Sequence, residues 1–150
     1  MATVFKPKYI VAQLIVVLLK NLTDGSIATS VQISNTTDLY LDVLVQLSVK
    51  TGSGVDTDNG VIRVFVIASV DGGVTYPDVS NDELIPIGVF NANVDTTTFK
   101  SPPMSVANAF GGKLPEKYKI VVKNDTGANL DNVDEAVHLK QYQGIQGQYS

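Results

Sequence analysis

Apolar and polar side chains alternate with period two from Tyr40 to Lys50, in the stretch YLDVLVQLSVK. This pattern predicts a β-strand with one buried face and one polar face. A single buried face is typical of an antiparallel sandwich, because the strands of a parallel sheet are covered on both sides. Leu44 departs from the pattern on the outward face, which also carries Tyr40. The residues that we expect to point into the core are Leu41, Val43, Val45, Leu47 and Val49.

A β-branched run followed by a glycine-broken corner lies between residues 61 and 78, in the stretch VIRVFVIASVDGGVTYPD. The run predicts a strand from Val61 to Val70, because β-branched residues fit a pleated, half-buried surface. Asp71, Gly72 and Gly73 supply turn geometry. We expect residues 74–76 to form the return limb of this corner, before Pro77.

Five further segments have the composition of strands. Pro86 lacks an N–H, so a strand that contains it belongs at a sheet edge or a bulge. In KYKIVVKN, residues 117–124, the lysines at 117, 119 and 123 point outward and form a positive ridge, a device typical of sheet edges or of solubility. Val137 and Leu139 share one face of the last and weakest segment. The five segments are Ser26–Ser34, Leu84–Asn91, Thr96–Lys100, Lys117–Asn124 and Glu135–Gln141.

The segment IVAQLIVVLLK, residues 10–20, is apolar almost throughout. It is compatible with a short buried helix or with a strand covered on both faces, and its β-branched residues favour the strand. It is shorter than the ~20 residues that a membrane-spanning helix needs. Its place behind Lys6 and Lys8 resembles the apolar part of a signal peptide, but no A-x-A-like cleavage site follows. We interpret it as a buried core strand.

These patterns together predict an all-β fold, an antiparallel β-sandwich of jelly-roll-like type with about eight strands. The 150 residues suit a single domain, residues 1–150, with short extensions at residues 1–9 and 141–150. Aromatic side chains bury much area for little loss of rotamer entropy, so aromatics in such extensions are candidate anchors on a neighbouring molecule. Frayed ends are the alternative interpretation. The candidate interface residues are Phe5, Tyr9, Tyr142 and Tyr149.

The charge composition favours association with other protein subunits. Charged residues make up 17% of the chain, below the roughly 25% that is usual, and hydrophobic residues make up 44%. The net charge of -4 offers no basic surface for nucleic acid, and we expect neither a nucleic-acid nor a membrane partner. An apolar-rich chain of this kind either has an unusually full core or hides part of its outside against neighbours, and sheet proteins in oligomers do the second. We therefore expect a homo-oligomer.

No combination of residues in the sequence predicts catalysis, a cofactor or a metal site. His138 is the only histidine and there is no cysteine, so neither a two-histidine mechanism nor a zinc site is expected. His138 itself is interpreted as a surface or interface residue. In VDTDNG, residues 55–60, the spacing resembles a calcium loop, but position twelve is Ile67 rather than glutamate, which favours a polar turn. The candidate carboxylates for glycoside hydrolysis lie in predicted loops. They are Asp78, Asp82, Glu83, Asp131, Asp134 and Glu135.

Two motifs resemble structural proteins of tailed bacteriophages. SVDGGVTYPD, residues 69–78, is a Ser-x-Asp-Gly corner with a nearby tyrosine, and it follows the valine-rich strand. LPEKYKIVVKNDTGANLD, residues 114–131, is a Lys-Tyr-Lys-Ile strand that ends in an Asn-x-Thr-Gly turn. The resemblance covers roughly residues 38–131. Gly73, in place of a more polar corner residue, and the glutamine-rich C-terminus depart from it.

The resemblance implies a virion component with a jelly-roll-like fold. It points to a capsid decoration, or cement, protein that is made in the host cytoplasm. Such a protein sits on the capsid surface as a small homo-oligomer such as a trimer, in contact with the major capsid protein. The alternative is a glycan- or receptor-binding sandwich of a tail fibre or base plate. Its stacking platforms would be Tyr76 and Phe110, with Asp71, Asp78 and Asn81 as hydroxyl partners.

Overall fold

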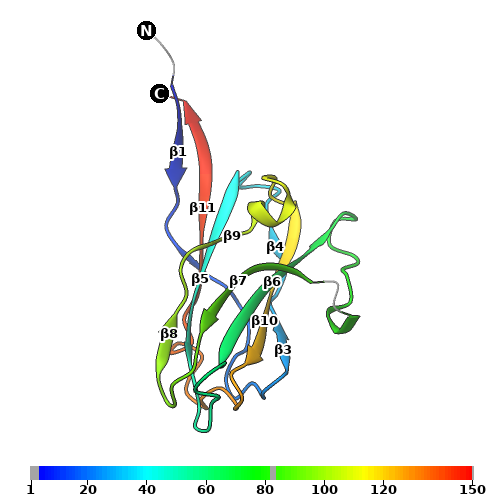
Figure 1. The fold of residues 1–150 in the computed structure, drawn as a ribbon. Coiled ribbons are helices and arrows are strands. Elements are labelled where there is room, and N and C mark those ends of the chain that lie inside the picture. Colours follow the sequence, from blue (N-terminus) through cyan, green and yellow to red (C-terminus); the bar gives the residue numbers. More distant parts are fainter. Residues whose placement is uncertain (1–3, 82–83, 150) are drawn as a thin grey trace.

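The computed structural model describes residues 4–81 and 84–149 and consists of two antiparallel sheets packed face to face (Figure 1). This confirms the predicted all-β, jelly-roll-like sandwich. The described residues form eleven strands rather than about eight, several of them only two or three residues long. The first sheet contains β1 (Phe5–Tyr9), β11 (Lys140–Tyr149), β5 (Asp42–Lys50) and β8 (Thr98–Lys100), with β2 (Gln13–Leu14) beside β11 and β9 (Met104–Ser105) beside β5. The second sheet contains β3 (Ile27–Thr29), β10 (Lys117–Asp125), β6 (Val61–Ser69) and β7 (Ile85–Asn91), with β4 (Ile33–Ser34) beside β10.

The hydrophobic core lies between the two sheets, where the alternation of the sequence places it. The inward residues of β5 are fully buried, as are the facing residues of β6 and β10. Fully burying one such side chain contributes about 1.5–3 kcal/mol. The fully buried residues that face each other across the sandwich are Val43, Val45, Leu47, Val49, Ile62, Val64, Val66, Tyr118, Ile120 and Val122.

The start of β5 corrects one prediction. Tyr40, expected on the outward face, is 7% exposed, and Leu41, expected inside, is 50% exposed. The cause is Asn35, whose side-chain amide donates to the Tyr40 carbonyl and accepts from the Tyr40 N–H, at 2.9 and 2.7 Å. This clamp holds Tyr40 outside the strand, which begins at Asp42, and its ring turns inward over Gly144.

The apolar segment 10–20 also differs from its prediction. It is extended, but it pairs as a strand only at β2, and one of its faces is uncovered. Ile15, Val17 and Leu19 are buried, whereas Leu14, Val16 and Leu18 between them are exposed. The segment crosses from one sheet to the other, since the N–H of Ile15 donates to Lys140 in the first sheet and Val16 accepts from Val31 near the second.

In the second sheet, β7 is an edge strand and β10 is an interior strand. β7 lies at its edge, as Pro86 predicts, and the pairing register of β6 with β7 shifts between Val64 and Phe65, opposite Pro86. β10 pairs on both sides, with β6 and with β3, so its lysine ridge is not an edge device. Instead, the Lys117 Nζ donates to Ser34 and the Lys119 Nζ lies 4.3 Å from the centre of the Tyr76 ring.

The C-terminal third departs most from the sequence prediction. Residues 135–139 form a turn rather than a strand, and the long strand β11 begins at Lys140. His138 is not on the surface but fully buried. Its Nδ1 accepts from the Lys50 N–H at 3.1 Å, so the proton sits on Nε2, which faces the Asp131 carbonyl at 3.1 Å. A ring bonded on both sides in this way braces the turn.

Candidate assembly interface

The two chain ends pair with each other and project from the sandwich as a two-stranded ribbon, which we call the arm (Figure 1). The arm consists of β1 and residues 145–149 of β11. Phe5 lies opposite Tyr149, Pro7 opposite Gly147 and Tyr9 opposite Ile145. Within the predicted terminal extensions, residues 5–9 and 145–149 are therefore paired strands of one ribbon, while residues 1–3 and 150 lie outside the described residues.

The arm has one apolar and one polar face, because residues directly opposite in an antiparallel pair share a face. Phe5, Pro7, Tyr9, Ile145 and Tyr149 share the apolar face with Gly147. The Phe5 ring lies over Gly147 and meets the Tyr149 ring edge to face, with centroids 5.3 Å apart. The polar face carries Lys6, Lys8, Gln146 and Gln148.

The free edge of the arm is protected against pairing with another strand. Lys6, Pro7 and Lys8 occupy the middle of β1, which is the outer strand of the ribbon. Lysine and proline on an edge strand discourage edge-to-edge pairing, since proline has no N–H to donate. The arm is therefore suited to contact through its apolar face rather than through its backbone.

Three of the four predicted anchors, Phe5, Tyr9 and Tyr149, come together on this apolar face. Tyr142 does not join them. It lies at the base of the arm on the inward side of β11, where its hydroxyl donates to Gln13 Oε1 at 2.6 Å. Burial, and next the charges of Tyr40 and Asp38, raise the pKa of Tyr142. Its role is to hold β2 against β11.

A second apolar surface lies at the other end of β11, where the outward side chains of the segment 10–20 face solvent. We call it the apolar groove. It has a volume of about 330 Å³, and its apolar lining is almost continuous. The sequence does not predict this groove, because an apolar residue at nearly every position of the segment 10–20 indicates a strand covered on both faces. The outward-facing residues of the groove are Leu14, Val16, Leu18, Ala136 and Leu139.

The floor of the groove is fixed by Glu135 and Lys140. The Lys140 ammonium is buried and is paired with the Glu135 carboxylate. The same carboxylate accepts the backbone N–H groups of Leu19 and Lys20. Burial by itself raises the pKa of Glu135, but these hydrogen bonds and the Lys140 charge outweigh it and hold the pKa below its ordinary value. This contact ties the end of the segment 10–20 to the start of β11.

Between arm and groove, the outward side chains of β5 and β11 are uncharged. The outward-facing residues of β5 between Asp42 and Lys50 and those of β11 before the arm are leucine, glutamine and serine. Depletion of charge is what distinguishes the centre of a protein interface from other surface. The five residues are Leu44, Gln46, Ser48, Gln141 and Gln143.

The corner SVDGGVTYPD is held by Asp71. Its carboxylate accepts hydrogen bonds from the Ser69 hydroxyl and from the hydroxyl and N–H of Thr75, and these bonds hold the pKa of Asp71 far below its ordinary value. The Tyr76 hydroxyl donates to Gln32 at 2.6 Å, and Lys119 covers one face of its ring. The corner is a braced loop, not a strand pair.

The second motif, Asn-x-Thr-Gly, is a buried polar network. The Asn124 amide donates to the carbonyls of Leu22 and Ala128, both at 2.8 Å, and its oxygen accepts from Thr126. Both Asn124 and Thr126 are fully buried. Because each buried polar group has its partner, the motif fixes the turn after β10.

The loop acids are dispersed in the described part of the chain, where no group of three or more metal-ligating side chains is found. The Asp56 carboxylate in VDTDNG accepts the N–H groups of Asp58 and Asn59, as in an ordinary polar turn. Asp78 accepts from Ser80. Phe110 packs against the core, Asp82 and Glu83 lie outside the described residues, and the side chain of Asn81 is likewise not described.

A polar cavity of about 580 Å³ opens at the end of the sandwich distant from the arm, lined by Asn21, Ser53, Thr96, Asn129 and Asn132 among others. No described helix is long and apolar enough to cross a membrane.

Comparison with known proteins finds no matching family model and no matching curated protein. Among solved structures, one match is a chain of the Cowpea Mosaic Virus empty virus-like particle, determined by electron cryo-microscopy. The two chains are 12% identical, and the match covers 98% of this chain and 83% of that chain with a TM-score of 0.29. A TM-score this low supports no inference about this chain.

Proposed function

We propose that this chain is a non-enzymatic structural protein of a virion, and specifically a capsid decoration protein. It acts as a homo-oligomer on the capsid surface, where it contacts the major capsid protein and stabilises the shell. The observation that carries the proposal is the arm, a ribbon built from β1 and the end of β11 whose aromatic side chains Phe5, Tyr9 and Tyr149 share one face and are largely exposed. An exposed apolar face of this kind is typical of a protein–protein contact.

Two further observations support this assignment. The motifs that resemble tailed-phage structural proteins occupy the braced corner at Asp71 and the buried turn at Asn124, so they specify the sandwich itself. The outward side chains of β5 and β11 between the arm and the groove are also uncharged. A rigid sandwich with dedicated contact surfaces suits a protein whose task is to hold neighbours together.

The alternative, a glycan- or receptor-binding protein of a fibre or base plate, has less support from the residues first considered for it. Asp71 spends its carboxylate on its own loop, and Tyr76 already has Lys119 over its ring. Phe110 packs against the core rather than standing free. These side chains do not offer the open aromatic platform that sugar stacking requires.

The test is the composition of particles. Virions from the source of this sequence are purified on a density gradient, analysed by mass spectrometry and labelled with gold-conjugated antibody against the purified protein. We expect the protein to be present in many copies, with label distributed over the head. Label confined to the tail tip would support the alternative function, and absence of the protein from the particles would refute a virion role.

A further inference from the structure

We infer that two copies of this chain pack through the outward faces of their first sheets, with the arm of each copy lying in the apolar groove of the other. This inference deepens the proposed function, on which it rests, by naming the partner of the arm. The interface is two-fold symmetric. Both unpartnered apolar surfaces are then covered at once by a single contact.

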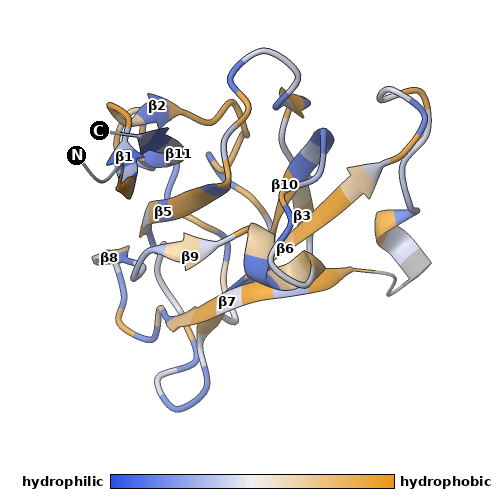
Figure 2. Cartoon of the chain, turned by 90° about the horizontal axis from the view of Figure 1, so that it is seen from above, coloured by the Kyte–Doolittle hydropathy of each residue, from blue (hydrophilic) through white to orange (hydrophobic). Residues whose placement is uncertain are grey.

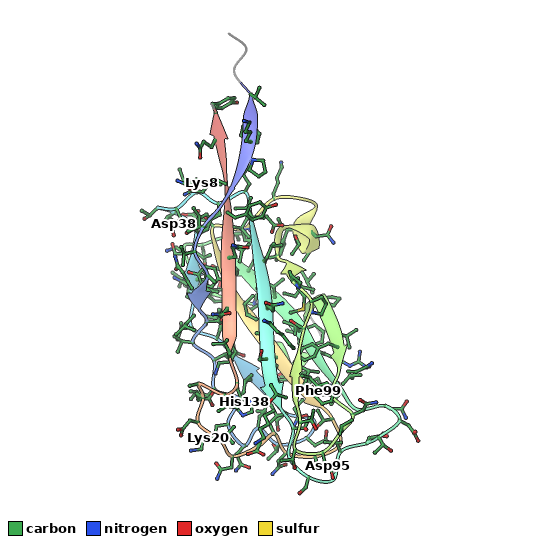
Figure 3. All side chains as sticks on the ribbon, turned by 90° about the vertical axis from the view of Figure 1, so that its left-hand side faces the viewer. Lys8, Lys20, Asp38, Asp95, Phe99 and His138 are labelled. Carbon is green, nitrogen blue, oxygen red and sulfur yellow. The ribbon has the colours of Figure 1, made fainter. Side chains whose placement is uncertain are left out.

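The arm cannot reach the groove of its own chain. β11 is one continuous strand of ten residues, and Leu14 lies opposite Gln141 at its beginning, whereas Phe5 lies opposite Tyr149 at its end. Eight residues of extended chain separate these two points by about 27 Å. In Figure 3, Lys8 of the arm and His138 beside the groove lie towards opposite ends of β11. The occupant of the groove must therefore come from another molecule.

Arm and groove lie on the same side of β11. Ile145, Gly147 and Tyr149 share their face with Gln141, because side chains alternate along a strand. Leu14 shares the face of Gln141, which it lies opposite. One flat contact between two sheets therefore reaches both surfaces.

The positions are symmetric about Gln143. Along β11, the groove begins two residues before Gln143, at the level of Gln141 and Leu14, and the arm's apolar face begins two residues after it, at Ile145. The two-fold axis lies between the two facing sheets, passes at Gln143 and runs perpendicular to β11. It reverses the strand direction of one copy and places each arm on the partner's groove. In such an isologous contact residue i meets j and residue j meets i, so the dimer closes upon itself.

The area and the charge suit a stable pair. Phe5, Tyr9 and Tyr149 are 51%, 58% and 70% exposed. At about 200 Å² for each aromatic side chain, this leaves roughly 350 Å² of aromatic surface on each arm. In the groove of the same copy, Leu14, Val16 and Leu18 are 68%, 58% and 72% exposed and add a comparable area. Each copy therefore contributes about 700 Å² before the polar centre is counted, near the roughly 800 Å² per partner of a stable complex. The centre of the contact, Gln141, Gln143, Leu44 and Gln46, brings no like charges together.

Stacking of sheet faces is favoured over addition of a strand. The lysines and the proline of β1 hinder pairing at the edge of the arm, whereas the aromatic side chains of its apolar face are exposed. Figure 2 views the molecule along the arm and shows β1, β2 and β11 grouped at one side of the sandwich, away from β7.

The test uses the full chain in solution and needs no virion, so its failure is distinguishable from failure of the proposed function. Light scattering and analytical ultracentrifugation give the mass of the wild type, of F5A/Y149A in the arm and of V16K in the groove. V89K, on the exposed face of edge strand β7, is the matched control. We expect a wild-type dimer, a dissociation constant raised at least about tenfold in the arm and groove variants, and no change in the control. Circular dichroism spectra, and melting temperatures measured at a concentration where every protein is monomeric, establish that the variants are folded, because association by itself raises the melting temperature of the wild type.

Crosslinking tests the axis. The chain contains no cysteine, so Q143C carries a single thiol. A short bis-maleimide reagent should link Q143C to its copy, because facing sheets are about 10 Å apart and the residue lies on the axis. V89C should remain unlinked. A monomeric wild type, or an oligomer that F5A/Y149A leaves intact, would overturn the inference, as would a trimer in which Q143C does not link.

Discussion

The two halves of β11 differ in what surrounds them, although they form one strand. Residues 140–144 pair with β5 on one side and with the segment 10–15 on the other, and Lys140 and Gly144 are buried. Beyond Ile145, the strand pairs with β1 alone and its last residues are exposed. The body half contributes to the free energy of folding, whereas the arm half contributes little, because an isolated two-stranded ribbon is only marginally stable in water. Stability and recognition are thus divided along a single strand.

The largest expected effect lies in the body. Leu47 is fully buried in the core, so Leu47→Ala removes apolar contacts and leaves a cavity. We expect the free energy of unfolding to fall by about 2–5 kcal/mol, measured by urea denaturation. Leu14→Ala, at an exposed position of the groove, is the matched control and, at a concentration where the chain is monomeric, should change it by less than about 0.5 kcal/mol. Equal losses of unfolding free energy in the two variants would contradict the conclusion that the body, and not the exposed contact surfaces, provides the stability.

Two glycines of β11, one in its body half and one in its arm half, test the same difference in packing. A Cβ at Gly144 would overlap the buried Tyr40 ring, and a Cβ at Gly147 would overlap the exposed Phe5 ring. Gly144→Ala should cost about 1–3 kcal/mol, because the tightly packed core cannot move aside. Gly147→Ala should cost clearly less, since the Phe5 ring is free to swing away. Thermal unfolding of both variants gives the comparison, and a reversed order would contradict it.

The contact between Glu135 and Lys140 adds a pH dependence to the body. The pKa of Glu135 is lowered in the folded state, so its contribution is complete above the ordinary glutamate value of 4.5 and is lost as the pH falls through the folded value. Glu135→Gln should lower stability by about 1–3 kcal/mol at neutral pH, because it leaves buried Lys140 without its charge partner. The gap to the wild type should close in acid. Melting temperature as a function of pH measures this, and a gap that is independent of pH would refute the role of the charge.

The smallest expected effect on stability lies in the arm. At a concentration where the chain is monomeric, Phe5→Ala should change the free energy of unfolding by less than about 0.5 kcal/mol, because the ring is half-exposed and packs against Tyr149 and Gly147 of the arm. Hydrogen exchange gives a further measure, since the amides of residues 5–9 should exchange faster in this variant than in the wild type at a concentration where the wild type associates. Arm amides as protected as those of β10 in a monomer would contradict the comparison.

The sequence predicts the body well and the arm poorly, for a physical reason. Period-two alternation at 43–49 and 117–124 reports burial of one face, which each strand shows by itself. The pairing of β1 with β11 joins residues at the two ends of the chain, and neither strand carries a signal for a partner so far away. The aromatics at Phe5, Tyr9 and Tyr149 marked the surface, but the ribbon that gathers them could not be predicted.

The groove and Tyr40 show a second limit. Buried and exposed residues alternate along the segment 14–19 in the structure, but all six residues are apolar, so the sequence does not indicate which side faces solvent. Tyr40 turned inward because of Asn35, an asparagine five residues earlier that clamps its backbone. A side chain that overrides a strand pattern through two hydrogen bonds leaves no trace in the hydrophobic periodicity.

The antiparallel pairing of β1 with β11 also fixes how the molecule responds to force. Phe5 and Tyr149 lie side by side at the tip, so tension between the two chain ends opens the ribbon one hydrogen bond at a time, as a zipper opens. Tension between the tip and the sandwich instead pulls β11 lengthwise past β5, and its backbone bonds share the load together. A contact made through the arm therefore resists force between the arm's tip and the sandwich well, and resists force that separates β1 from β11 poorly.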